Sequence, residues 1–200
     1  MTPASRGFSP RRVSAERARR LPPGQYETRD FPVLSVGPTP RGAERDWSLA
    51  VTGAAEPRRL DWDALLALPS ETIAADIHCV THWSKLDTTW TGVPLDALVE
   101  PLPGATHLLA HCEGGYTTNL ALSDALGGRA WIAYAYEGEP LAPAHGGPAR
   151  LLVPHLYFWK SAKWVRRLEL LRAHAPGYWE ANGYHDRGDP WREQRYQGDA

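Results

Sequence analysis

The sequence predicts a single α+β domain in which short strands form mixed sheets and helices are few and short. Short runs of alternating apolar and polar residues recur along the chain, which is typical of half-buried strands. Glycine and proline number 18 each, so turns are frequent. Alternating strand–helix units with a glycine-rich first turn are absent from the sequence, which argues against a dinucleotide-binding Rossmann fold. A chain of 200 residues that is 42% hydrophobic can bury one substantial core.

The first 20 residues differ in charge from the rest, with six arginines and one glutamate. We expect residues 1–20 to form a basic, flexible, solvated arm, followed by one domain over 21–200. No apolar run follows the arginine pairs, so we expect no secretory signal. No stretch of 18 apolar residues predicts a membrane span. We therefore expect a cytoplasmic protein with its two cysteines reduced. A net charge of −1 gives no indication of a nucleic-acid partner.

The elements follow in order along the chain. Residues 21–42 are rich in proline and glycine yet apolar, which favours an extended segment laid over the domain. A short helix is expected to begin at Asp61 and end before Pro69, and a second to cover 93–102. The tail at 175–196 has too many aromatic residues to be free in solvent, so we expect it to pack back. Strands are predicted at 47–53, 72–80, 106–112, 116–122, 131–138, 149–155 and 163–174.

Cys79 is the first candidate for chemistry, because the strand at 72–80 delivers it to a stretch that we interpret as a turn, "THWSKLDTTW". A free cysteine often packs as a small hydrophobic residue. It could also be the nucleophile of a thiol hydrolase with a histidine base, or a metal ligand. A zinc site is not favoured, since His107 and His111 on one strand lie about 13 Å apart. A non-catalytic, tryptophan-rich binding module is the third alternative.

The segment "HGGPARLLVPHLYFWKSAKWVRRLEL" at 145–170 contains a possible anion cradle. Arg150, Lys160 and Ser161 combine a guanidinium fork, a lysine charge and loop amides, a combination that favours phosphate. The alternative is that these charges lie on a solvated face.

Several motifs together resemble a known family. These are "DIHCVTHWSKLDTTWTGVPLDALV", "EGGYTTNLAL", "IAYAYEGEPLAPAHGGPARLLVPHLYFWKSAKWVRRLEL" and the aromatic tail. Over 21–196 the chain resembles the molybdopterin-binding oxidoreductases of the sulfite oxidase group. The resemblance is closer to small bacterial members and to the catalytic subunit of periplasmic methionine sulfoxide reductase than to animal sulfite oxidase. It implies a sulfite oxidase-type molybdopterin-binding catalytic domain.

The resemblance also implies roles for individual residues. Cys79 would ligate molybdenum beside the two dithiolene sulfurs of one pyranopterin, a soft ligand for a metal already bound by sulfur. His82 and Tyr116 would join Cys79 at the catalytic pocket. The expected partners are a small-molecule substrate and an external electron donor or acceptor protein. The residues implied to bind the molybdenum–molybdopterin cofactor are Arg29, Pro32, Val33, His145, Arg150, Phe158, Trp159, Lys160 and Ser161.

The chain departs from the family pattern just after the cysteine. Animal and plant sulfite oxidases have arginines there that can hold an anionic substrate, whereas residues 80–85 here read "VTHWSK". A desolvated doubly charged anion needs convergent positive groups, because a buried charge without partners is costly. The sequence therefore predicts oxygen-atom transfer that favours S-oxide or N-oxide reduction over sulfite oxidation.

Overall fold

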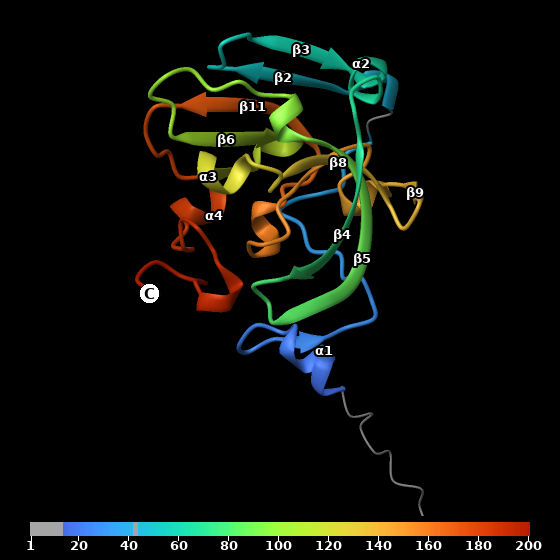
Figure 1. Cartoon of the computed structure of the whole chain (residues 1–200), viewed down its shortest axis with the longest axis vertical. Helices are drawn as coiled ribbons and strands as arrows, with labels where there is room; N and C mark the ends of the chain where they lie inside the picture. Colours follow the sequence, from blue (N-terminus) through green and yellow to red (C-terminus); the bar gives the residue numbers. More distant parts are fainter. Residues whose placement is uncertain (1–13, 42–43) are drawn as a thin grey trace, which may run out of the picture.

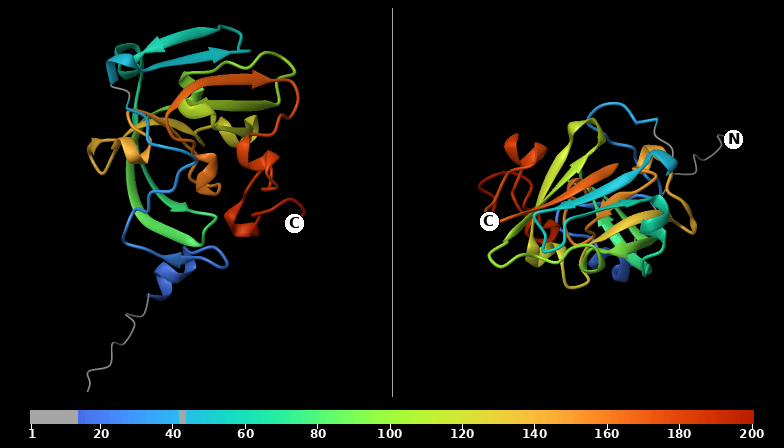
Figure 2. Two further views of the ribbon diagram at one scale, coloured as in Figure 1. Left: turned by 180° about the vertical axis from the view of Figure 1, so that it is seen from behind. Right: turned by 90° about the horizontal axis from the view of Figure 1, so that it is seen from above.

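Two β-sheets form the body of the protein in a computed structural model that describes residues 14–41 and 44–200 (Figures 1 and 2). The five-stranded sheet has the order β3-β2-β11-β6-β7. Its pairs are antiparallel except β2 with β11, which is parallel. The strands are β2 (Ser48–Thr52), β3 (Arg58–Asp61), β6 (His107–Cys112), β7 (Thr117–Ala121) and β11 (Val165–Leu171).

The six-stranded sheet follows the path β1-β5-β8-β10, with β4 paired to β5 and β9 to β8. Here β1 runs parallel to β5 and the other pairs are antiparallel. Both sheets are therefore mixed, and the predicted α+β class with short mixed sheets is confirmed. The strands are β1 (Tyr26–Glu27), β4 (Glu71–His78), β5 (Trp83–Pro94), β8 (Trp131–Tyr136), β9 (Glu139–Pro140) and β10 (Arg150–Leu152).

The α-helices of the described residues have at most five residues each. Helix α2 begins after Asp61, whose carboxylate accepts a hydrogen bond from the Ala64 amide at 2.9 Å, as the N-cap prediction requires. None of the helices described is long and apolar enough to cross a membrane. The helices are α1 (Ala15–Arg19), α2 (Trp62–Leu66), α3 (Leu122–Ala125) and α4 (Tyr178–Ala181).

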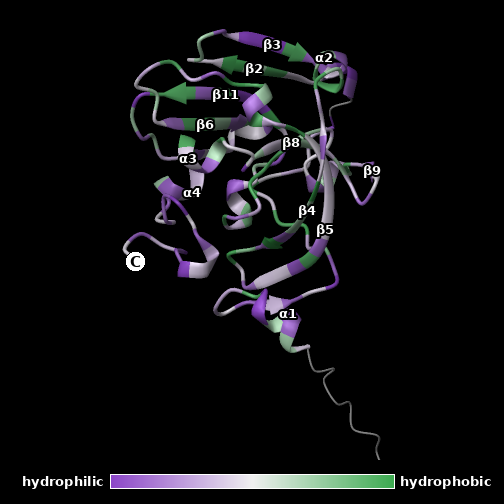
Figure 3. Ribbon diagram, viewed as in Figure 1, coloured by the Kyte–Doolittle hydropathy of each residue, from purple (hydrophilic) through white to green (hydrophobic). Residues whose placement is uncertain are grey.

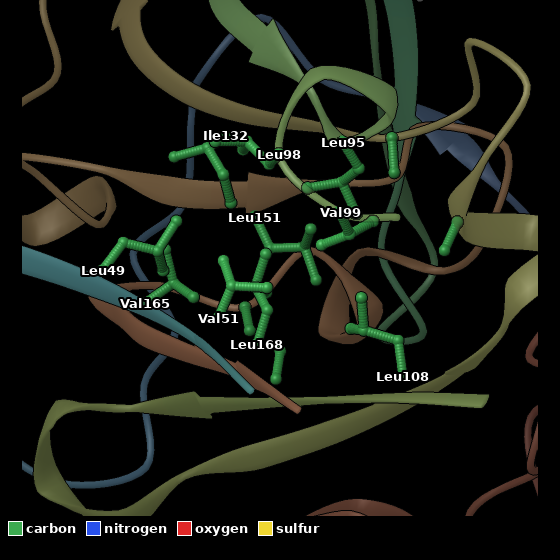
Figure 4. Close-up of a cluster of buried hydrophobic side chains, with 14 of the residues drawn as sticks. Leu49, Val51, Leu95, Leu98, Val99, Leu108, Ile132, Leu151, Val165 and Leu168 are labelled. Atoms are coloured by element: carbon green, nitrogen blue, oxygen red, sulfur yellow. The ribbon is translucent and has the colours of Figure 1, made fainter. Parts of the chain in front are cut away.

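The main hydrophobic core joins the two sheets. Leu49 and Leu108 from the five-stranded sheet and Ile132 and Leu151 from the other are all fully buried in one cluster (Figure 4). Along β2, buried and half-buried residues alternate, so one face of the strand enters this core. In Figure 3, β2 and β11 contain hydrophobic stretches, whereas β3 is largely hydrophilic. Burial of these apolar side chains holds the two sheets against each other.

A second, smaller cluster lies against the β4–β5 pair and contains Cys79 itself. Ile77, Trp83 and Trp90 are among its buried members on this pair, and the partly buried Phe31 packs against the cluster. Cys79 therefore lies at the edge of a packed aromatic layer, and its position depends on that layer.

Two predicted elements are wrong. The stretch "THWSKLDTTW" is not a turn, because β5 begins at Trp83 and pairs with β4 over most of its length. Its threonines and tryptophans favour strands, and they alternate between the two faces. The helix predicted at 93–102 is only a 3₁₀ turn at Leu95–Ala97, because Pro94 stays in β5 and pairs with Trp131 of β8.

The basic arm falls partly outside the described residues, which exclude 1–13 and 42–43. Residues 14–20 are mostly exposed to solvent and include the short helix α1, which lies beside the β4–β5 pair (Figure 1). Arg17 pairs with Glu27 at 2.7 Å and with Asp87 at 2.6 Å, and Arg20 pairs with Asp76 at 2.5 Å. Single exposed pairs contribute little, but a network of them can fix a short helix in place.

Candidate active site

The turn between β4 and β5 holds Cys79 in a fixed position. The Cys79 amide donates to the Trp83 carbonyl at 2.9 Å, and the His82 amide donates to the Cys79 carbonyl at 3.1 Å. Distant segments then complete the turn. The Gln25 side-chain amide donates to the Cys79 carbonyl at 2.9 Å, and the Arg195 guanidinium donates to the Val80 carbonyl at 2.6 Å. The N-terminal segment and the C-terminal tail thus both position the thiol.

A cavity of about 310 Å³ opens beside this thiol. Four segments form most of its walls: the turn after β4, the arm at 31–36, the stretch at 158–164 and the C-terminal tail. Tyr116, His145 and Arg150 complete the lining. Most of the lining side chains are aromatic or aliphatic, which is typical of small-molecule and cofactor sites.

Within the described part of the chain, the Cys79 thiol forms no hydrogen bond with a histidine. The Sγ atom lies 3.1 Å from the Thr81 hydroxyl oxygen, and the nearby His78 ring is hydrogen-bonded through Nδ1 to Ser84 at 2.8 Å. Burial raises the pKa of the Cys79 thiol, whereas a thiol hydrolase needs an activated thiolate. The contacts of this thiol among the described residues therefore argue against a thiol hydrolase.

Arg150 is the strongest electrostatic feature of the cavity. It is 1% exposed, donates to the carbonyls of His145 (2.7 Å) and Ser161, and lies 4.1 Å from the Phe158 ring centre. No carboxylate pairs with it among the described residues. Burial lowers its pKa to about 9. A buried cation without a counter-ion is costly, so an anion bound here would be strongly favoured.

Lys163 adds a second cation to the same cavity wall. Its Nζ donates to the carbonyls of Leu34 and Ala144, each at 2.7 Å, which ties the arm to the body. Burial, followed by the nearby charge of Arg150, lowers the Lys163 pKa to about 8. In the part of the chain that the structure describes, no carboxylate pairs with Lys163 either.

The structure places Lys160 differently from the anion cradle inferred from the sequence. Its side chain is fully buried away from the cavity lining, and Nζ lies 2.5 Å from Glu180 Oε1 and 2.6 Å from Asn119 Oδ1. The 3₁₀ turn at Phe158–Lys160 directs Lys160 toward β7 and the tail, while Lys163 reaches the cavity. Ser161 does line the cavity, and its hydroxyl accepts a hydrogen bond from the Val153 amide at 2.8 Å.

Three other residues implied by the resemblance lie outside the cavity lining. Arg29 and Val33 are exposed, because the arm is extended and turns Phe31 and Pro32 inward instead. His82 has a left-handed φ of 75°, and its Nδ1 atom is hydrogen-bonded at 2.9 Å to the Gly24 carbonyl. Its ring therefore faces the arm. The implied residues that the structure does bring to the cavity are Cys79, Pro32, Tyr116, His145, Arg150, Phe158, Trp159 and Ser161.

Some lining residues were missed by the sequence reasoning. Phe31 stacks on His145 with a centroid distance of 3.9 Å. Trp179 and Tyr184 come from the tail, whose packing was predicted without a place for either ring. Two features of the sequence could have indicated Lys163 and the tail rings. One is the second lysine of "WKSAKW", three residues after the first, and the other is the density of aromatic residues in the tail.

Comparison with known proteins places this site in a family. Residues 36–179 match the oxidoreductase molybdopterin binding domain. The chain belongs to this family. It is 44% identical over 190 residues to the uncharacterized oxidoreductase YuiH of Bacillus subtilis, which covers 92% of this chain and 96% of YuiH. It is 31% identical over 155 residues to the protein-methionine-sulfoxide reductase catalytic subunit MsrP of Gluconobacter oxydans, covering 66% of this chain and 49% of MsrP.

The fold agrees with that assignment. The crystal structure of the sulfane dehydrogenase SoxCD from Paracoccus pantotrophus matches with a TM-score of 0.62 at 18% identity, covering 86% of this chain and 56% of that one. The chain thus spans about half the length of MsrP and of the SoxCD chain. The predicted sulfite oxidase-type molybdopterin oxidoreductase is confirmed, and the protein is an enzyme of that family.

The residues present fit a molybdopterin group. The cavity combines a soft sulfur at Cys79 with two cations, Arg150 and Lys163, that lack carboxylate partners in the described chain. The buried His145 Nδ1 and Trp83 Nε1 atoms, on rings that line the cavity, also form no hydrogen bond with the described residues. Sulfur for the metal and positive charge for a phosphate are the donor types that such a cofactor requires.

Proposed function

We propose that this protein is a molybdenum-dependent oxidoreductase that removes an oxygen atom from a small neutral S-oxide or N-oxide. One observation carries the proposal. The Cys79 thiol shares a single cavity with Arg150 and Lys163, two cations without a carboxylate partner among the described residues, and the remaining walls are mostly aromatic or aliphatic. The Cys79 sulfur and the two cations would bind the cofactor, and the apolar walls would contact the substrate.

The side chains divide between two tasks. Arg150, Lys163 and Ser161 would hold the phosphate of one pyranopterin, since guanidinium and ammonium groups form charge-assisted hydrogen bonds with phosphate oxygens. Pro32, His145, Phe158 and Trp159 would contact its rings, and Cys79 would ligate molybdenum. When bound, the cofactor supplies the redox chemistry of oxygen-atom transfer.

The charge of the cavity supports a neutral substrate. Once a phosphate occupies Arg150 and Lys163, the walls near the thiol that remain include Thr81, Tyr116 and Tyr184. Arg195 lies close to this turn, but its guanidinium is engaged by the Val80 carbonyl and does not line the cavity. Sulfite would be desolvated there without convergent cations. The named activity of the relative MsrP, protein-methionine-sulfoxide reduction, agrees with this choice.

The proposal includes an external redox protein, because removal of one oxygen from an S-oxide consumes two electrons and two protons. The aromatic residues of the cavity would orient the substrate and exclude water from the reacting oxygen. A cytoplasmic location stays a prediction.

Metal analysis and two opposed assays test the proposal. The purified protein should contain close to one molybdenum and yield a fluorescent pterin after oxidation. Reduced viologen should be oxidised with dimethyl sulfoxide, methionine sulfoxide or trimethylamine N-oxide. Ferricyanide reduction with sulfite should be slower at equal cofactor loading. A sulfite rate well above every S-oxide and N-oxide rate would contradict the proposed direction and substrate class.

A further inference from the structure

The hydroxyl of Thr81 lies against the sulfur of Cys79. Its Oγ1 atom is 3.1 Å from the Cys79 Sγ atom, and both residues line the cavity. Thr81 is exposed, so water was available to its hydroxyl, yet the hydroxyl is directed at the sulfur. In the proposed function Thr81 is only a part of the cavity wall, which does not account for this contact.

The direction of this hydrogen bond depends on the state of the sulfur. A thiol can donate to the hydroxyl or accept from it, so either atom can be the donor in the metal-free protein. A cysteine that ligates a metal is a thiolate and has no proton to donate. Once Cys79 is a metal ligand, the Thr81 hydroxyl must therefore be the donor and the sulfur the acceptor.

The other groups that act on this sulfur are backbone amides and a charge. The amides of Val80 and Thr81 face the thiol, and the Arg195 guanidinium contributes a positive charge near it. The ring of the neighbouring His78 is engaged through Nδ1 with Ser84 at 2.8 Å. In the described part of the chain, Thr81 thus supplies the one side-chain hydrogen bond to this sulfur.

The turn that carries Thr81 is held by segments from both ends of the described chain. The Gln25 side-chain amide donates to the Cys79 carbonyl at 2.9 Å, and the Arg195 guanidinium donates to the Val80 carbonyl at 2.6 Å. The hydroxyl and the sulfur are therefore in place before a metal binds. Groups that are held in this way around a metal ligand fix its orientation and its electron density.

We propose that Thr81 is a positioning residue that tunes the redox potential of molybdenum through the sulfur of Cys79. The inference rests on the proposed function, because it takes Cys79 as the molybdenum ligand. A hydrogen bond withdraws electron density from a thiolate, so the ligand stabilises the oxidised metal less and the midpoint potential rises. A higher potential makes the metal easier to reduce by the external donor, which S-oxide or N-oxide reduction requires.

The test compares variants that remove, restore or leave this hydroxyl. Thr81→Val replaces the hydroxyl by a methyl group of similar size, and Thr81→Ala is a second variant without a hydroxyl. Thr81→Ser keeps the hydroxyl. Thr91→Val is the matched control, because Thr91 lies on β5 and does not line the cavity. Molybdenum and pterin content are measured first in every holoenzyme.

A redox titration followed by the electron paramagnetic resonance signal of Mo(V) gives the midpoint potentials. Only molecules that contain molybdenum contribute to this signal, so incomplete loading does not shift the midpoint. In Thr81→Val the equilibrium constant for reducing Mo(VI) to Mo(V) should fall about three- to tenfold, a part of the strength of one hydrogen bond to a charged group. For a one-electron couple this fall is a potential lower by about 28–59 mV. Thr81→Ala should show the same shift, Thr81→Ser should recover most of it, and Thr91→Val should match wild type.

The absorption spectrum of the oxidised holoenzyme is a second readout that does not depend on turnover. The charge-transfer band from the cysteine sulfur to molybdenum is identified as the band that is missing in Cys79→Ser. A sulfur that is richer in electrons gives this band at longer wavelength. The band should therefore move to longer wavelength in Thr81→Val and Thr81→Ala and stay in place in Thr91→Val.

The inference and the proposed function fail on different measurements. If loaded Thr81→Val and Thr81→Ala have the potentials and the band of wild type, the hydroxyl is only a part of the cavity wall and the inference is overturned. If loaded wild type reduces no S-oxide or N-oxide, the proposed function fails, while the potentials still decide the role of Thr81. Wild type without molybdenum would overturn both.

Discussion

Replacing Lys160 by methionine should strongly lower the free energy of unfolding of the protein and have little effect on its pterin content. The Lys160 ammonium lies 2.5 Å from Glu180 Oε1 and also donates to two Asn119 oxygens and the Asp186 carbonyl, with no exposed surface on either charged side chain. Methionine fills a similar volume without charge. Glu180 would then be a buried carboxylate with only the Trp159 and Thr118 donors, and its Oε2 atom has no donor among the described residues.

The size of the effect follows from that unpaired charge. Removing one member of a buried ion pair costs about 3–5 kcal/mol, because the other member stays desolvated. For a domain of this length, each kcal/mol lowers Tm by about 2–4 °C, so a fall of roughly 6–20 °C is expected. Lys160→Met combined with Glu180→Gln should cost less than the sum of the single changes, because the double variant contains no buried unpaired charge.

Urea unfolding of the cofactor-free protein, followed by tryptophan fluorescence, measures these free energies. Arg45→Ala is the control, since Arg45 and Asp46 form an exposed pair at 3.8 Å, and it should change stability by less than about 0.5 kcal/mol. Lys163→Met should lower pterin content with a smaller loss of stability. A cost below about 1 kcal/mol for Lys160→Met would contradict the structural role of this ion pair, as would a larger loss of pterin than Lys163→Met causes.

Three further predictions concern the cavity. Cys79→Ser should abolish oxygen-atom transfer and leave much of the pterin bound, whereas Cys112→Ser, on buried β6, should change stability alone; turnover and pterin fluorescence check both. Arg150→Met with Lys163→Met should lower molybdenum and pterin content together, since each charge-assisted hydrogen bond to phosphate contributes about 1.5–3 kcal/mol. Because burial and Arg150 lower the Lys163 pKa to about 8, the ammonium is present below that pH and lost above it. The fraction of pterin that stays with the protein on gel filtration should therefore fall as pH rises through about 8. The same rise in pH should not change this fraction in Lys163→Met.

Much of the fold could be predicted from local pattern. Local pattern marked β2, β6 and β7 as strands, with alternating burial along β2 and β6, and Asp61 marked the start of α2. The errors occurred where pairing overrode composition. The residues after Cys79 carry turn-like polar side chains, yet they continue as β5 because β4 is available as a partner over most of its length.

Three features that limit the possible chemistry can be read from the residues in order along the chain: one cysteine at a strand end, a basic segment at 145–163, and a tail too aromatic to remain in solvent. Which side chains meet depends on the folded arrangement. Lys160 and Lys163 are equivalent cations in the sequence, but the 3₁₀ turn that ends at Lys160 directs this side chain to Glu180, whereas Lys163 reaches the cavity. His82 lies three residues from Cys79, yet a left-handed backbone turns it toward Gly24, while Tyr184 reaches the cavity from the tail. Side-chain direction depends on local dihedral angles and on long-range packing, and neither follows from residue type or spacing alone.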